Sequence, residues 1–142
     1  MDAQWSRIKS IVDSDETSTF DGQLSTFYQH LLRSLELPCE VTGTEDFNWE
    51  ERYVFGGGSR AEYERLKKER PSYRDKYQLL SIKMGVFSEW MICGGEDIGA
   101  HVKRKSDAKE FWLGLSELKG VEEKSQNAQQ ILDFAVFFVN SR

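Results

Sequence analysis

The sequence predicts an α+β fold: an N-terminal amphipathic helix, a curled antiparallel sheet of about five strands resembling an SH3-like barrel, and a C-terminal helix. Two observations lead to this prediction. Between Tyr77 and Leu115, apolar and polar residues alternate in short runs separated by turns, which is the period of a strand. Before and after the strands, over 20–35 and 125–140, apolar residues recur at helical spacing.

The N-terminal helix is the clearest element of the chain. Thr19 or Ser18 can cap it, because a hydroxyl accepts from the free N–H groups of the first turn, and Pro38 prevents it from running on. We expect both Leu31 and Leu32 in the core. The full apolar stripe consists of Phe20, Leu24, Phe27, Tyr28, Leu31, Leu32 and Leu35.

Two shorter helices are also predicted. One covers residues 5–12, and the other runs from Ser59 to Arg70, with Ser59 as N-cap and Glu62 as its capping-box partner. The C-terminal helix runs from Ser125 to about Asn140. Its expected main apolar stripe is Ile131, Leu132, Ala135, Val136 and Val139. Three further residues widen this stripe, so more than one face of the helix is expected to be buried: Phe134, Phe137 and Phe138.

The predicted strands are short and bounded by turn residues. They cover Pro38 to Gly43, Tyr77 to Met84, Trp90 to Cys93, Ile98 to Lys103 and Phe111 to Leu115. With 142 residues the chain is expected to form one domain, 1–142. Within it we expect residues 1–19 to be a loosely packed N-terminal extension and 56–76 to be an insertion-like charged helical segment.

Charge is distributed unevenly along the chain. The net charge is −5, so general nucleic-acid binding, which draws on Lys and Arg, is not expected. Residues 1–51 hold eleven acidic and three basic residues, whereas 60–76 hold seven basic and four acidic ones. No apolar run long enough to span a membrane and no signal-peptide pattern occur, so we expect a cytoplasmic protein without membrane contact.

No sequence pattern for catalysis is present, and we expect a non-enzymatic protein. A Gly-x-Ser-x-Gly motif, a phosphate loop after Gly56-Gly57-Gly58 and zinc-ligand spacing are all missing. His30 and His101 are expected at the surface or its boundary. Cys39 and Cys93 are expected to be reduced thiols.

Acidic residues gather in two places, and this clustering suggests a metal site. Calcium takes six to eight oxygen ligands from carboxylates, carbonyls and water, so it favours carboxylates grouped on flexible loops. The pattern of an EF-hand is absent, so any site would be irregular and weak. The alternative is that these loops are solvated acidic surface. The candidate metal ligands are Glu45, Asp46, Glu50, Glu51, Glu96 and Asp97.

Three fragments resemble the bacterial calcium-binding proteins of the cyanobacterial CcbP type. They are the helix-to-strand segment Tyr28–Val41, the strand pair ending in Leu-Ser-Glu-Leu over Ala100–Leu118, and the closing helix with Asn127, Ile131 and Asp133. The resemblance implies a small barrel-like sheet with flanking helices, and Ca²⁺ as the bound ion, held by surface acidic residues. This sequence departs from the family pattern at 56–76, where a basic helical segment is found in place of a strand.

Two other functions stay open at this point. One is a protein-interaction module of the immunity or antitoxin kind, using its acidic surface or exposed aromatic residues against a basic partner. The other is a hydrolase whose site is not recognisable in the sequence. The sequence does not determine the oligomeric state or the identity of a protein partner.

Overall fold

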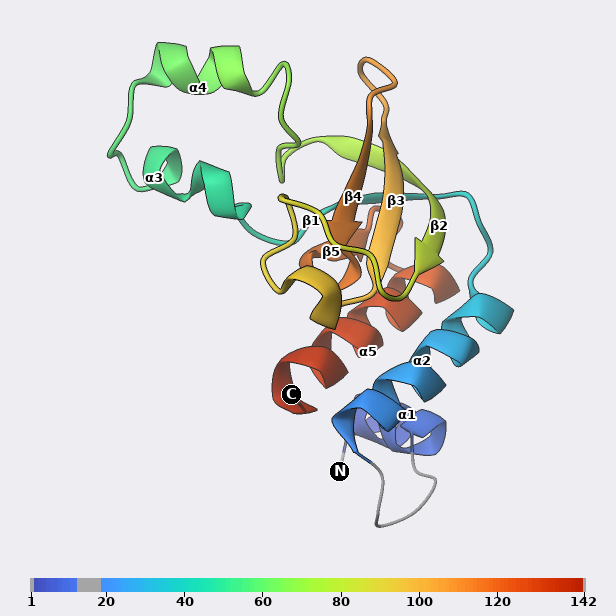
Figure 1. The fold of residues 1–142 in the computed structure, drawn as a ribbon. Coiled ribbons are helices and arrows are strands. Elements are labelled where there is room, and N and C mark those ends of the chain that lie inside the picture. Colours follow the sequence, from blue (N-terminus) through green and yellow to red (C-terminus); the bar gives the residue numbers. More distant parts are fainter. Residues whose placement is uncertain (1, 13–18, 142) are drawn as a thin grey trace.

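A computed structural model describes residues 2–12 and 19–141 of the protein. It is an α+β structure with one five-stranded sheet and helices before, within and after it (Figure 1). The α-helices are α1 (Ala3–Val12), α2 (Phe20–Ser34), α3 (Glu51–Val54), α4 (Arg60–Leu66) and α5 (Gln126–Ser141). The strands are β1 (Cys39–Gly43), β2 (Lys76–Lys83), β3 (Gly99–Arg104), β4 (Glu110–Gly114) and β5 (Leu118–Gly120), and three short 3₁₀ turns are η1 (Asn48–Glu50), η2 (Gly94–Glu96) and η3 (Leu115–Glu117).

The sheet is antiparallel in the order β4-β3-β2-β1-β5. β4 and β5 are its two edges and do not pair with each other, so the sheet is open and the predicted closure into an SH3-like barrel is wrong. The predicted strand at Trp90–Cys93 is also wrong, because this stretch forms turns that lead into η2. In its place β5, which the sequence pattern did not indicate, is the fifth strand. A strand of three residues is too short to show an alternation.

The N-terminal helix α2 begins as predicted. The Thr19 side chain accepts a hydrogen bond from the Gly22 N–H, whereas Ser18 lies outside the described residues. Leu31 is fully buried, but Leu32 is 48% exposed, so the prediction that both belong to the core is wrong for Leu32. Two adjacent helical residues point about 100° apart, and only one of them can face the sheet.

The helix α1 packs against α2 and α5. Its Ile8 and Val12 are buried in the main core, and Arg7 forms an ion pair of 2.9 Å with Asp133 of α5. The described part of the N-terminal extension is therefore held by both apolar and ionic contacts. Residues 13–18 lie outside the described residues.

The C-terminal helix α5 supplies much of the core. Of the predicted main stripe Ile131 is fully buried, whereas Leu132 is 52% and Val139 71% exposed, so the prediction is wrong for these two residues. Phenylalanine rings take the interior face, and Phe134 packs edge-on to Phe27 of α2 with centroids 5.5 Å apart. The large aromatic residues therefore decide which face of the helix is buried. The buried apolar residues of α5 are Ala128, Ile131, Phe134, Phe137 and Phe138.

Between β1 and β2 the chain leaves the sheet as an arm that carries η1, α3 and α4 (Figure 1). The helix predicted from Ser59 to Arg70 ends at Leu66, and Ser59 caps it by accepting from the Glu62 N–H. Arg104 of β3, which is 2% exposed, fastens the end of the arm. It donates to the carbonyl oxygens of residues 67, 68 and 70 and pairs with the carboxylates of Asp75 and Asp107.

Among the described residues no helix is long and apolar enough to cross a membrane.

Candidate functional site

The first acidic cluster falls at the base of the arm, and its members have different environments. Glu45 and Glu51 are exposed, and Asp46 is half-buried in the loop before η1. Glu50, the last residue of η1, is completely buried. The four carboxylates therefore do not share one solvent-facing surface.

The buried Glu50 carboxylate is surrounded by donors. One oxygen accepts from the Tyr73 N–H at 2.8 Å, and the other accepts from the hydroxyls of Tyr63 at 2.6 Å and Ser72 at 2.7 Å. A longer bond of 3.4 Å comes from the Phe47 N–H. Burial and the bond to Glu50 together raise the pKa of Tyr63. Since these donors come from α4 and from both ends of the arm, Glu50 holds the arm in place.

The second acidic pair lies where η2 ends. Glu96 is exposed, whereas Asp97 is 1% exposed. Asp97 accepts a hydrogen bond from the Ile98 N–H at 2.7 Å. It also accepts from the Ser116 hydroxyl at 2.5 Å and from the Ser116 N–H at 3.3 Å. A buried carboxylate is thus fixed beside the turn η3.

Glu117, which was not among the candidate ligands predicted from the sequence, approaches Asp97 in the structure. Its carboxylate accepts from the Ile92 N–H at 3.2 Å. The nearest atoms to the point where a Cβ on Gly114 would stand are Asp97 Oδ2, at 2.5 Å, and Glu117 Oε2, at 2.6 Å. The missing side chain at Gly114 therefore leaves room for two carboxylates, which we call the Asp97–Glu117 pair.

Within this pair, Glu117 has an unusually high pKa for a glutamate. Burial, and next the charge of Asp97, raise the pKa of Glu117 to about 7, although the N–H groups of Ile92 and Gly114 oppose the shift. At neutral pH the Glu117 carboxyl is therefore close to half protonated. A cation bound beside it would favour the charged form.

One backbone contact brings the first acidic cluster toward this pair. The Thr44 N–H donates to the Glu117 carbonyl oxygen at 2.9 Å, so the loop that carries Glu45 and Asp46 starts beside η3. Even so, over residues 2–12 and 19–141 no three His, Cys, Asp or Glu side chains converge in a way that could hold a metal through side chains alone. In the sequence Glu117 is marked only by its place in Leu-Ser-Glu-Leu, directly after the strand predicted to end at Leu115. No local pattern shows that its side chain is half-buried.

Both histidines pack against aromatic rings. His101 stacks on Trp112, with ring centroids 4.9 Å apart, and its Nε2 lies 2.8 Å from the carboxylate of Glu110. His30 is near Phe27, and partial burial lowers its pKa.

Comparison with known proteins finds similarity in structure only. No protein-family model and no curated protein matches the sequence. The crystal structure of Anabaena CcbP superposes with a TM-score of 0.57 at 13% sequence identity, covering 94% of this chain and 87% of that one. A calcium-binding protein in its calcium-binding form superposes with a TM-score of 0.54 at 14% identity, covering 96% of this chain and 89% of that one. The predicted resemblance to the CcbP type is confirmed at the level of the fold, which this chain shares over nearly its whole described length.

Proposed function

We propose that this protein binds Ca²⁺ and that the Asp97–Glu117 pair is the centre of its binding site. The observation that carries the proposal is the convergence of two carboxylate oxygens on the space left by Gly114. The fold supports it, because one of the two structures compared above is of a calcium-binding protein in its calcium-binding form. We accordingly propose a binding role without catalysis.

The chemistry of the pair suits a hard cation. Calcium prefers carboxylate, carbonyl and water oxygens, and it tolerates irregular coordination. Asp97 and Glu117 would hold the ion, and the Ser116 hydroxyl beside Asp97 offers a neutral oxygen. Glu96 adjoins Asp97 in sequence, and the loop of Glu45 and Asp46 begins next to η3. We propose these three as outer contributors that attract the ion.

The remaining two candidates of the first cluster fit this role less well. Glu50 is buried and already accepts four hydrogen bonds. Glu51 is exposed at the start of α3. We propose that Glu50 stabilises the arm and that Glu51 contributes only to the acidic surface.

Binding is expected to be weak and pH-dependent. Only two carboxylates are preorganised, so the dissociation constant should be on the order of 10⁻⁴ to 10⁻³ M. The ion competes with the proton that Glu117 binds with a pKa of about 7. Affinity for calcium should therefore rise between about pH 6 and pH 8 and then level off.

Calorimetry and thermal melting in CaCl₂ test the proposal. Wild-type protein should release or absorb heat on titration and should melt at a higher temperature in about 5 mM calcium, by mass action. Glu117→Gln should abolish both effects and keep the fold, because glutamine resembles the protonated glutamate. Glu51→Gln is the matched control, which removes one exposed negative charge and should keep both effects.

Two results would count against the proposal in different ways. If the wild-type protein shows neither heat nor a melting shift, calcium binding itself fails. If it binds calcium and Glu117→Gln binds equally well, the ion is bound elsewhere on the protein. A magnesium titration with the same variants measures selectivity, since Mg²⁺ demands stricter octahedral geometry.

A protein-interaction module is the second candidate, and exposed aromatic residues favour it. Phe55 at the end of α3 is 77% exposed and Phe87 is 81% exposed, with Ile92 also open to solvent at 57%. Apolar side chains indicate a contact site where they are close together on the surface, and Phe87 and Ile92 are five residues apart in one loop. Such contacts do not require calcium, so the titration above separates the two functions.

A further inference from the structure

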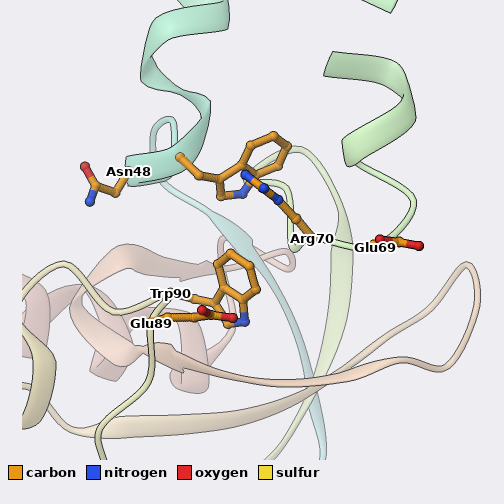
Figure 2. A pocket seen from close by; sticks show the side chains of 6 residues that line it. Asn48, Glu69, Arg70, Glu89 and Trp90 are labelled. Carbon is orange, nitrogen blue, oxygen red and sulfur yellow. The ribbon is translucent and has the colours of Figure 1, made fainter. Parts of the chain in front are cut away.

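A hollow of about 440 Å³ lies between the arm and the chain that leads into η2, and it shares no residue with the Asp97–Glu117 pair. Its volume is within the range of small-molecule sites, roughly 300–1,000 Å³. Two tryptophans and four polar residues line it, and Figure 2 shows Arg70 and Trp90 reaching it from different segments. The lining residues are Asn48, Trp49, Glu69, Arg70, Glu89 and Trp90.

Both indole rings are held in place by contacts outside the hollow. The Trp49 Nε1–H donates to the Pro71 carbonyl oxygen at 2.6 Å. Trp90 packs edge-on to Phe111 of β4, with centroids 6.4 Å apart and planes at 85°. Because these rings are already ordered, a ligand that stacks on them loses little side-chain entropy on binding.

The polar groups around the rings are mixed in kind. Arg70 offers only donors and lies over the Trp49 ring at 5.4 Å, Glu69 and Glu89 offer only acceptors, and Asn48 offers both. Hydroxyl groups, which donate and accept, are the ligand groups that can use all of these partners together. The flat C–H face of a sugar ring matches an indole face, and its hydroxyls point outward from the ring.

Other ligand classes fit the hollow less well. An organic cation would meet the Arg70 guanidinium, which already occupies the cation position over Trp49. A phosphate-bearing ligand would be repelled by Glu69 and Glu89, and a purely apolar ligand would leave four polar side chains unused. We propose that this hollow is a binding site for a neutral saccharide, with a pyranose ring stacked on Trp90 and its hydroxyls bonded by Arg70, Glu89 and Asn48.

The experiment is a titration of the protein, in EDTA to remove calcium, with neutral hexoses, N-acetylhexosamines and short neutral oligosaccharides built from them. Heat of binding and ¹H–¹⁵N spectra are recorded. Saturable binding should shift the indole N–H signals of Trp49 and Trp90 and leave those of Trp5 and Trp112 in place. Trp90→Ala should weaken binding about tenfold or more. Trp112→Ala is the matched control, since that indole lies against His101 and outside this hollow.

Milder variants keep the test valid if Trp90→Ala fails to fold. Asn48→Ala and Glu89→Gln change exposed side chains, and each should weaken saccharide binding severalfold with an unchanged melting temperature. The proposal is overturned if no saccharide in the panel binds, or if binding persists unchanged in these variants. Binding of tetramethylammonium chloride without any saccharide binding would also overturn it and would assign the hollow to cations.

Discussion

Replacing Glu50 by glutamine is expected to destabilise the protein strongly, although the side chains have nearly the same shape. The carboxylate is fully buried and accepts from four donors, two of them hydroxyls within 2.7 Å. Glutamine keeps one acceptor oxygen and places an NH₂ group where the other oxygen stood. The Tyr63 and Ser72 hydroxyls must then rotate and accept from this NH₂ group, so two bonds to a charged carboxylate become weaker neutral bonds.

The size of the effect follows from the weakened bonds. A hydrogen bond to a charged group contributes about 1.5–3 kcal/mol and a neutral one about 0.5–1.5 kcal/mol, so weakening two gives roughly 2–3 kcal/mol. In a domain of this size that corresponds to a fall in melting temperature on the order of 5–10 °C. Chemical denaturation followed by circular dichroism measures the free energy of unfolding directly.

Glu51→Gln, one residue further along the chain, is the matched control, because it removes the same charge from an exposed position. It should change the free energy of unfolding by less than about 0.5 kcal/mol. An equally small effect for Glu50→Gln would refute the structural role given to Glu50. Glu50→Gln and Glu51→Gln should both keep the rise in melting temperature that calcium causes in the wild-type protein.

Three further predictions concern stability. Leu31→Ala should cost about 2–5 kcal/mol and Leu32→Ala less than about 1 kcal/mol, as measured in urea, and equal losses would contradict the assignment of the buried face of α2. Arg104→Ala should cost about 3 kcal/mol or more and make the arm between β1 and β2 sensitive to protease, whereas an unchanged digestion pattern would mean that the arm is held by other contacts. The pKa of Glu117 is raised from 4.5 to about 7 in the folded state, so calcium-free protein should lose stability as the pH rises from about 4.5 to 7. Glu117→Gln should remove that loss and be more stable than wild type at pH 8 by about 1–3 kcal/mol, and a pH profile identical to wild type would contradict the raised pKa.

The sequence by itself determined the elements that local rules govern. The helix from Phe20, its Thr19 cap and the closing helix over 126–141 follow from periodicity and capping, which depend on residues a few positions apart. Strands β2, β3 and β4 follow from alternation in the same way. Fold class was predictable for the same reason, because the order of these elements limits how they can be layered.

Only the tertiary structure decided the pairing of groups distant in the chain. The open edges of the sheet, the burial of Glu50 and the side of α5 that faces inward depend on contacts between segments far apart in sequence. Asp97 and Glu117 meet because the sheet brings η2 beside η3, and Gly114 leaves space between them. Clustering along the sequence pointed to Glu45, Asp46, Glu50 and Glu51, but a binding site forms where folding brings side chains together, and four neighbours in a chain can face four directions.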